Sequence, residues 1–340
     1  MMPQPYHHKI SHHAQLGGIE TAVLDNGPQR GSRIAWFNTG SGLRFKVLLD
    51  RAMDIADAFY NQHSLGWINA TGVRPPSMNS DKGIDWLKSF GGGLLTTCGL
   101  THVGGPESDE FGERGLHGPI SNMPAEIESV IQPDPQAGKM TMSITGKIPQ
   151  TRIFGPSLEL KRTISCVLGQ ASIFIHDEVT NRGNTPAPHM LLYHCNLGYP
   201  LVDEGAQILW KGNWQAGGTG KRIIFTDSHD FHTCPPPMPA HNGSGEEVAF
   251  IDVAADAEGM CSGGLHNPNL GITLTLHFSK AQLPWLTNWQ HWGEGEYVTG
   301  IEPGTHPPIG QSAARARNTL IFLAPGETKT YELQIAITTS

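Results

Sequence analysis

The sequence predicts an all-β protein, built as a large antiparallel β-sandwich. Three observations favour this fold class: apolar and polar residues alternate along many segments, helical periodicity is scarce, and turn-forming residues are abundant. The chain of 340 residues contains 41 Gly and 25 Pro with no repeating period. Because Gly and Pro concentrate in turns, this composition indicates many short strands rather than a fibrous or low-complexity chain.

Strict alternation identifies the clearest strands. Every second residue is apolar in Met140–Thr145, in Leu270–Phe278 and in Tyr331–Ile337. Side chains of a strand point alternately to opposite faces, so this pattern is typical of a strand with one buried face. Further strands are expected at Arg33–Asn38, Arg44–Leu49, Leu158–Val167, Ser172–Val179, His189–His194, Glu247–Val253 and Asn318–Leu323.

One short helix is expected, beginning at Ser80 or Asp81 and ending at Phe90. Ser80 and Asp81 are suited to cap its first turn, and Asp81 and Asp85 would lie near the positive end of the helix dipole. No second segment of the chain predicts a helix.

No linker divides the chain into domains. The Pro-rich stretch Pro235–Pro239 looks like a boundary, but strands are expected on both sides of it without a change of composition. We therefore interpret it as a surface loop and expect residues 1–340 to form a single domain, with 1–16 as a loosely ordered N-terminal segment. That segment is polar and lacks the apolar run of a signal peptide or membrane helix.

Charge and cysteine content narrow the classes of function. Only 16% of residues are charged, the net charge is −8 and Lys and Arg do not cluster, which argues against a nucleic-acid or anionic-membrane partner. The five cysteines form no CxxC pair, so neither a zinc ribbon nor a thioredoxin-like motif is predicted. We interpret them as reduced thiols of a cytoplasmic protein. A neutral small molecule such as a sugar suits this composition, and the oligomeric state stays open.

Histidines that lie beside glycines or among apolar residues are the first candidates for chemistry. Glycine lets a ligand approach the backbone closely. Four histidines meet this description: His102 in Gly99–Gly105, His117 in Arg114–Gly118, His194 in Leu191–Asn196 and His306 in Gly304–His306.

Two charged residues and a group of tryptophans complete the set. Arg51 follows a strand, and Glu302 lies at a strand end before a Pro-Gly turn, where a buried carboxylate is costly without a partner. Taken singly, each such residue is more often a hydrogen-bonded structural residue. Tryptophans 285, 289 and 292 precede Glu302 and either pack in the core or offer an apolar platform to the C–H face of a sugar.

Together these segments resemble the aldose 1-epimerase (galactose mutarotase-like) superfamily, and most closely its DUF4432 branch. The glycine-rich block and the Leu-His-Gly element are the most specific parts of the resemblance. It runs in the same order from Arg51 to the C-terminus, through Asp50–Asp54, Phe90–Leu100, Gly115–Gly118, Tyr193–Pro200, Gly300–Pro303 and Leu323–Glu327. The resemblance implies the β-supersandwich fold, in agreement with the alternation.

The resemblance also implies roles for four residues. In mutarotases an Arg and a His early in the chain hold sugar hydroxyls, a middle His is the general acid and a late Glu is the general base. Matched by motif, Arg51 and His117 would hold hydroxyls, while His194 and Glu302 would be the acid and the base. We expect these four side chains to line one concave surface.

Three further residues, His102, His306 and Trp289, are expected to border the same cleft. The sequence departs from the mutarotases in two respects. His194 is followed by Cys-Asn-Leu-Gly-Tyr, where mutarotases usually continue Ser-Tyr-Phe-Asn-Leu. The aspartate that typical mutarotases use on a sugar hydroxyl has no matching position.

The implied reaction is acid–base chemistry. Opening a cyclic hemiacetal removes the anomeric hydroxyl proton and protonates the ring oxygen, which a carboxylate and a histidinium on opposite sides of the ring can do without a cofactor. A second interpretation is a lyase or isomerase for an oxidised sugar, with a divalent metal on His102, His117, His194, His306 and Glu302, although no HxH or HExxH spacing supports it. A third is a carbohydrate-binding protein without catalysis.

Overall fold

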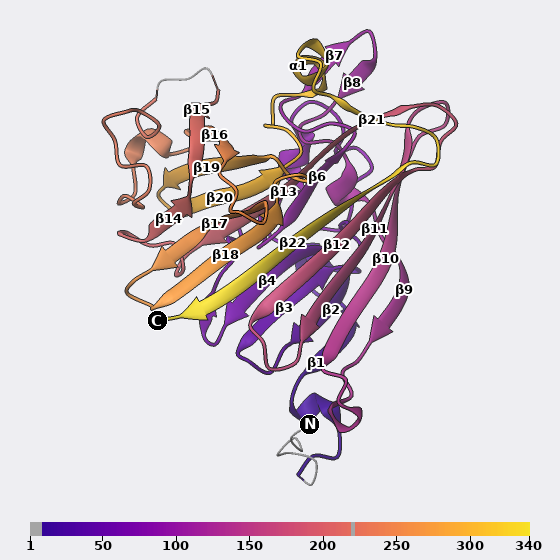
Figure 1. Cartoon of the computed structure of the whole chain (residues 1–340), viewed down its shortest axis with the longest axis vertical. Coiled ribbons are helices and arrows are strands. Elements are labelled where there is room, and N and C mark those ends of the chain that lie inside the picture. The colour runs from indigo at the N-terminus through magenta and orange to yellow at the C-terminus, as the bar shows by residue number, and fades with distance from the viewer. Residues whose placement is uncertain (1–8, 219–221) are drawn as a thin grey trace.

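The computed structural model describes residues 9–218 and 222–340, and it confirms the all-β prediction. Its largest sheet is antiparallel and has eight strands (Figure 1). In spatial order these are β14 (Gln207–Trp210), β17 (Met260–Asn267), β18 (Ile272–Ser279), β22 (Thr328–Thr339), β12 (Ser172–Asn181), β11 (Ser157–Val167), β10 (Thr141–Thr151) and β9 (Glu126–Ile131).

A seven-stranded sheet carries the segments of chemical interest. Its main path runs through β15 (Gly212–Ala216), β16 (Glu247–Val253), β19 (Trp285–Gly293), β20 (Glu296–Gly304), β13 (Ala187–Gly198) and β21 (Ile321–Leu323). Strand β6 (Thr96–Leu100) pairs with β13 beside this path. The long strand β13 is therefore the centre of the sheet.

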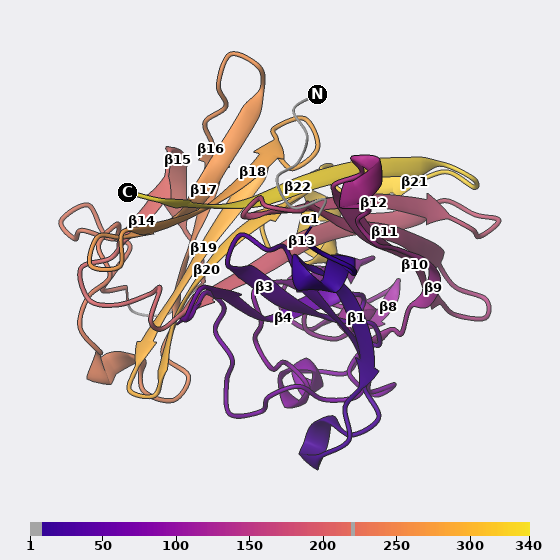
Figure 2. The same ribbon diagram turned by 90° about the horizontal axis from the view of Figure 1, so that it is seen from below.

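The N-terminal part of the chain forms a five-stranded sheet. Its strands pair in sequence order: β1 (Gly18–Val23), β2 (Arg33–Asn38), β3 (Leu43–Leu48), β4 (Asp54–Tyr60) and β5 (His63–Ser64). Paired hydrogen bonds between Ile55 and Leu95 join it to the chain leading into β6. Figure 2 shows this sheet and strands β13, β19 and β20 on the same side of the eight-stranded sheet. One hydrophobic cluster fills the space between the layers, as a β-sandwich requires.

Helical structure is short and local. A hairpin of β7 (Glu107–Asp109) and β8 (Gly112–Arg114) adjoins the one α-helix of the described residues, α1 (Gln311–Ala316). The 3₁₀ turns are η1 (His13–Gln15), η2 (Gly27–Gln29), η3 (Asp85–Lys88), η4 (Ile120–Asn122), η5 (Pro135–Ala137) and η6 (Pro239–His241). Within these described residues, no helix is both long and apolar enough to cross a membrane.

Two helix predictions are wrong. The segment from Ser80 to Phe90 forms only η3, because Gly83 adopts a left-handed conformation (φ 48°) that interrupts a right-handed helix. Asp81 accepts a hydrogen bond from the backbone N–H of Gly115 instead of capping a helix. The helix α1 was not expected, and the strand predicted over Asn318–Leu323 is reduced to β21 because the chain before it turns out of α1.

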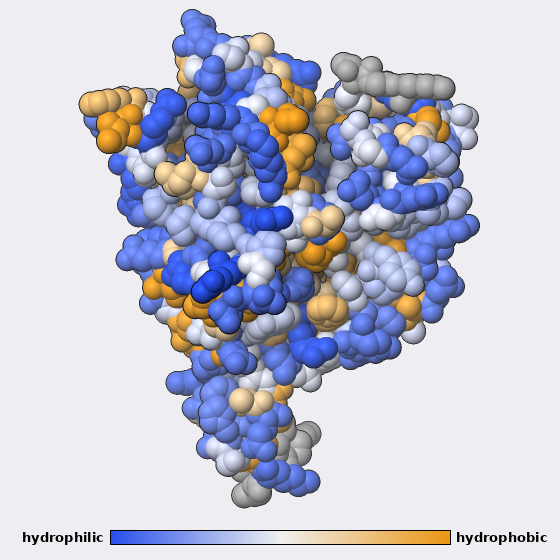
Figure 3. Space-filling model, turned by 180° about the vertical axis from the view of Figure 1, so that it is seen from behind, coloured by the Kyte–Doolittle hydropathy of each residue, from blue (hydrophilic) through white to orange (hydrophobic). Residues whose placement is uncertain are grey.

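The N-terminal segment and the Pro-rich loop bear on the domain prediction. Within 1–16, residues 1–8 lie outside the described part, whereas η1 is ordered by a cap from His12. Pro235–Pro239 lies in the connection between β15 and β16, which are paired strands of the same sheet. On the face seen in Figure 3, polar residues dominate and apolar residues occur in small separate groups.

Candidate active site

Four neighbouring strands of the seven-stranded sheet place His194 and Glu302 side by side in one row of residues. Thr96 of β6 is paired with His194 of β13, and Glu302 of β20 is paired with Thr287 of β19. The β13–β20 pairs on both sides, such as Cys195 with Ile301, place His194 opposite Glu302. Directly opposed residues of antiparallel strands share a face, so these four side chains lie on one face of the sheet, here called the site face.

His194 and Glu302 are in direct contact within this row. Nε2 of His194 lies 3.3 Å from Oε1 of Glu302, and the two residues are only 6% and 2% exposed. The contact is not aligned as a hydrogen bond: Oε1 of Glu302 and Nδ1 of His194 are both buried without a partner. Unpaired buried polar atoms are costly, so their presence in adjacent side chains is typical of a functional site.

Gly300 explains how Glu302 fits beside the sheet. The two residues are on the same face of β20, and the carboxylate folds back over the glycine. A Cβ atom at position 300 would lie 2.2 Å from Oε1 of Glu302, closer than any side chain allows. The Gly-Ile-Glu spacing is therefore required by the position of the carboxylate.

Aromatic rings surround His194 on three sides. Its ring centroid lies 5.4 Å from Phe90, 5.5 Å from Trp289, 5.8 Å from His117 and 6.3 Å from Trp86. These rings fill the space beside the acid–base pair. His117 and Trp289 are half-buried, and we call these two residues the rim. Nδ1 of His117 is also buried without a partner.

The buried environment favours the uncharged forms of both groups. Burial lowers the pKa of His194 to about 4 and raises the pKa of Glu302 well above its usual value, with the negative charge of Glu246 adding to the second shift. Burial also lowers the pKa of His117, and the neighbouring His194 and His102 act in the same direction. The protein interior around the pair therefore disfavours both the imidazolium form of His194 and the carboxylate form of Glu302.

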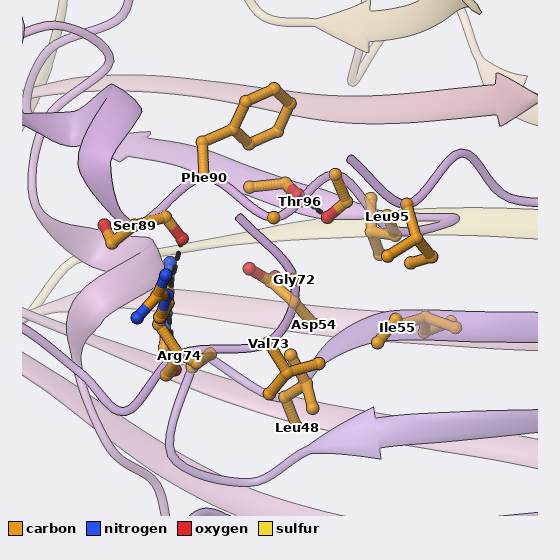
Figure 4. Close-up of a pocket in the computed structure, with 15 residues that line it drawn as sticks. Leu48, Asp54, Ile55, Gly72, Val73, Arg74, Ser89, Phe90, Leu95 and Thr96 are labelled. Carbon is orange, nitrogen blue, oxygen red and sulfur yellow. Dashed lines mark hydrogen bonds between the residues drawn. The ribbon is translucent and has the colours of Figure 1, made fainter. Parts of the chain in front are cut away.

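Arg51 lies behind Phe90 rather than in the row. Its guanidinium donates hydrogen bonds to the carbonyl oxygens of Ser121, of Ser89 at 3.0 Å and of Arg74 at 3.3 Å. It lines a narrow cavity of about 20 Å³, together with Phe90 and Thr96 (Figure 4). Burial lowers the pKa of Arg51 to about 10, and the carboxylate of Asp54 opposes that shift.

His102 and His306 use both ring nitrogens within the protein. The Nε2 atom of His102 lies 2.9 Å from the Gly105 carbonyl, and Nδ1 accepts from the N–H of Gln311 at 3.3 Å. His306 bonds the Thr305 hydroxyl and the Thr319 carbonyl, both at 2.8 Å. These two histidines hold the chain around α1. In residues 9–218 and 222–340, no three His, Cys, Asp or Glu side chains converge as a set of metal ligands.

The tryptophans divide between the two faces of β19. Trp285 and Trp289 share the site face with Thr287, whereas Trp292 points to the opposite face and is fully buried. The indole Nε1 of Trp289 donates to Glu246 at 2.7 Å. The core interpretation holds for Trp292, and the platform interpretation of Trp289 stays a prediction.

Four residues near the pair were not found by sequence reasoning. Trp86, Thr287 and Glu246 carry no motif and reach the site through strand register and loop packing. Phe90 belongs to the matched glycine-rich block, so its place in that block was the available signal.

The opposite face of the same sheet, here called the core face, carries a fully bonded ionic network. Arg162 is fully buried and donates to both carboxylate oxygens of Asp177, at 2.9 and 2.7 Å. The hydroxyl of Tyr193 donates to the same carboxylate at 2.7 Å, and Arg162 also donates to the Thr97 hydroxyl at 2.8 Å. The network ties β6 and β13 to the eight-stranded sheet directly beneath His194.

Comparison with solved structures places the fold among the galactose mutarotase-like proteins. A protein from Klebsiella pneumoniae subsp. pneumoniae MGH 78578, described as a candidate aldose 1-epimerase, superposes with a TM-score of 0.81 at 24% identity over 95% of this chain and 83% of its own. A galactose mutarotase-like protein from Clostridium acetobutylicum gives 0.64 at 10% identity, over 95% and 98% of the two chains.

The galactose 1-epimerase from Lactobacillus acidophilus NCFM gives a TM-score of 0.59 at 10% identity, over 95% of this chain and 99% of its own. At such identities the similarity establishes the fold. No protein with a curated description matches the chain. A family model, the domain of unknown function DUF4432, matches residues 29–337. The resemblance seen in the sequence is thereby confirmed, and the chain belongs to the DUF4432 family.

Proposed function

We propose that the chain is an aldose 1-epimerase-type enzyme that interconverts the anomers of a free sugar, with His194 and Glu302 as the proton-transfer pair. The observation that carries the proposal is the contact between these two buried, unbonded groups on one sheet face. A purely structural pair would be expected to satisfy its hydrogen bonds.

The contact changes the expected geometry of the reaction. The sequence suggested an acid and a base on opposite sides of the sugar ring, but His194 and Glu302 are neighbours only 3.3 Å apart. The anomeric oxygen and the ring oxygen are bonded to the same carbon, so an adjacent pair reaches both when the sugar presents its C1 edge. In this proposal the C1 edge approaches the pair beside the half-buried rings of His117 and Trp289.

The pair needs only one proton to run the cycle. In ring opening, one member takes the O1 proton, the O1 electron pair forms the carbonyl, the C1–O5 bond breaks and O5 receives a proton from the other member. The proton has then moved from the acid to the base through the sugar. Rotation about C1–C2 and the reverse transfers close the ring on the other face.

In the roles that the resemblance implies, ring opening starts from ionised Glu302 and protonated His194 and ends with both groups neutral. Burial favours the neutral pair, as the directions of both pKa shifts show. Ring closure starts from this neutral pair, whereas ring opening in these roles requires a proton to move first from Glu302 to His194. The hydroxyls of a bound sugar would supply hydrogen bonds to ionised Glu302.

Glu246 is our candidate for the acidic residue that the sequence could not place. It is exposed, it accepts from the indole of Trp289, and its charge acts on Glu302. A carboxylate at the rim is suited to hold a sugar hydroxyl. Arg51 remains a proposed binding residue, acting through the Ser89–Phe90 backbone that it holds.

The test is anomer exchange followed by NMR on a panel of free aldoses, with and without a chelator. The proposal predicts accelerated exchange that the chelator leaves unchanged, and its loss in Glu302→Gln. Exchange that the chelator abolishes would favour a metal-assisted reaction instead. Sugar binding without any exchange would leave a binding protein.

A further inference from the structure

A second cavity lies close to the candidate site, and the segment that contains Trp67 and Ile68 separates the two. The second cavity measures about 350 Å³ and is lined by Ser64, Gly66, Trp67, Ile68, Tyr199, Gly295 and Tyr297. We call it the outer pocket. Its volume is in the range of pockets that bind small molecules, whereas the cavity beside Arg51 holds only about 20 Å³.

The wall between the two regions is Trp67 with Ile68. The backbone N–H of Trp67 donates to the Asn196 carbonyl at 3.0 Å, two residues from His194. Its ring lies 6.0 Å from Trp289 and 6.0 Å from Phe90, the two rings that contact His194. Ile68 lines both the outer pocket and the cavity beside Arg51. A ligand at the acid–base pair and a ligand in the outer pocket would therefore be neighbours.

The lining of the outer pocket suits an uncharged, ring-shaped ligand with hydroxyl groups. Trp67, Tyr199 and Tyr297 supply aromatic surface, and none of the lining residues carries a charge. Tyr199 is 69% exposed and Ile68 is 38% exposed, which is unusual for large apolar side chains that share a concave surface. The Ser64 hydroxyl, which donates to the Gly66 carbonyl at 3.2 Å, adds a polar group that can still accept. Aromatic faces with a few polar groups match the C–H faces and hydroxyls of a sugar.

We propose that the outer pocket binds a second, uncharged sugar unit, so that the preferred substrate is a reducing disaccharide or longer glycan rather than a monosaccharide. Its reducing-end unit would meet His194 and Glu302, and the next unit would cross Trp67 and rest on Tyr199. This inference rests on the proposed function. The absence of a cation from the lining disfavours a phosphorylated or oxidised second unit.

The test compares anomer exchange of cellobiose, lactose and maltose with that of glucose and galactose. At least one disaccharide should show a kcat/KM about tenfold or more above that of its reducing-end monosaccharide, because a second subsite adds binding that the transition state retains. In Tyr199→Ala this ratio should fall to near one, and Ile68→Ser on the other wall should lower it as well. Tyr199→Phe, which keeps the ring, should retain most of the preference.

Phe154→Ala is the matched control, because Phe154 is fully exposed on the β10–β11 turn and lies outside the pocket. It should leave the ratio unchanged. Two results would overturn the proposal that the outer pocket binds a second sugar unit. One is exchange of monosaccharides with no preference for disaccharides, and the other is a preference that survives both Tyr199→Ala and Ile68→Ser. Either result would leave the proposed function standing.

No exchange on any sugar would overturn the proposed function. Sugar binding in the outer pocket is then tested by saturation-transfer NMR of the same disaccharides. Binding that Tyr199→Ala abolishes and Phe154→Ala preserves would support it, and binding insensitive to Tyr199 would refute it.

Discussion

The buried polar groups on the two faces of strand β13 differ in their hydrogen bonding. On the core face, Tyr193 donates to Asp177, which is bonded twice by Arg162. On the site face, the next residue, His194, and its neighbour Glu302 retain buried atoms without partners. Adjacent residues of one strand therefore differ: the hydroxyl of Tyr193 is hydrogen-bonded, whereas Nδ1 of His194 has no partner.

Mutations on the two faces should differ in their cost in stability. A buried ion pair resists the loss of one partner, because the remaining charge has no water to return to. An unpaired group already destabilises the native state, so its removal costs little stability. Mutations on the core face should therefore change stability, and mutations on the site face should change activity.

The largest expected effect is on the core face. Asp177→Asn removes the carboxylate that Arg162 contacts at 2.7 Å, leaves the buried guanidinium only Asp54 at 3.4 Å, and should lower the free energy of unfolding by about 3–5 kcal/mol. Urea denaturation measures it. Glu159→Gln is the control, because its partner Arg182 is 55% exposed in the side chain and such surface pairs contribute about 0–1 kcal/mol. Equal effects of the two substitutions would contradict the contrast between the faces.

Glu302→Gln should have the largest effect on activity. It keeps the shape of the side chain but cannot exchange the proton, and it should lower the rate of anomer exchange by roughly 10²-fold or more. Stability should rise rather than fall. The pKa of Glu302 is raised in the folded state, whereas in the unfolded chain it has its usual value of 4.5. Above pH 4.5 the unfolded chain therefore releases a proton that the native state retains. The free energy of unfolding then declines as the pH rises.

Glutamine removes that dependence, so the variant should gain most over the wild type at pH 7 and above. Thermal unfolding across pH 5–8 checks the sign. A loss of stability that grows with pH would show that Glu302 is ionised and stabilised by its surroundings.

Gly300→Ala tests whether the carboxylate must lie over the glycine. The added Cβ would meet Oε1 of Glu302 at 2.2 Å, and the end of a flexible side chain can move away at small cost in stability. A displaced base should nevertheless lower the rate by about 10-fold to 10²-fold, since small misplacements of catalytic groups are expensive. Gly105→Ala, where no atom lies within 4 Å of the new Cβ, is the control.

The sequence predicted those features of the fold that depend on neighbouring residues in the chain. Alternation is a local pattern, so Leu270–Phe278 and Tyr331–Ile337 were recognised and lie largely within β18 and β22. The helix predicted over Ser80–Phe90 does not form because Gly83 adopts a left-handed conformation. The residue types of this segment do not predict that conformation.

The site was predictable only where a motif carried it. Glu302 and His194 belong to matched segments, and the structure brings them into contact. Thr287 and Glu246 depend on the pairing of strands far apart in sequence, and no local pattern gives that register. The bonding of His102 and His306 inside the protein was hidden for the same reason.

A pair of histidines on β13 sharpens the contrast between the faces. His189 and His194 are both buried, and burial lowers the pKa of each to about 4. His189 is on the core face, bonded to the Leu100 carbonyl and to the Tyr331 hydroxyl, whereas Nδ1 of His194 has no partner.

Both histidines should make the protein acid-sensitive. Their native pKa values lie below the unfolded value of 6.5, so the unfolded chain binds more protons and stability is lost as pH falls from about 6.5 to about 4. Either substitution by Gln should reduce this slope. At pH 7, however, His189→Gln should cost about 1–3 kcal/mol through broken hydrogen bonds and His194→Gln should cost almost nothing. Equal losses at pH 7 would remove the distinction.

The smallest predicted effect concerns the rim. Trp289→Phe keeps an aromatic ring beside His194 but removes the hydrogen bond that Nε1 donates to Glu246 at 2.7 Å. Glu246 is exposed, so the bond contributes little to stability, and its proposed role is to orient the carboxylate toward a sugar hydroxyl. We expect KM to rise about two- to fivefold with kcat nearly unchanged, which is the pattern of a lost binding contact. Glu246→Gln should raise KM similarly, and the double variant should be no worse than the single ones, because both remove one interaction. Additive losses would mean that Trp289 and Glu246 act on the sugar separately, with the tryptophan ring as a platform in its own right.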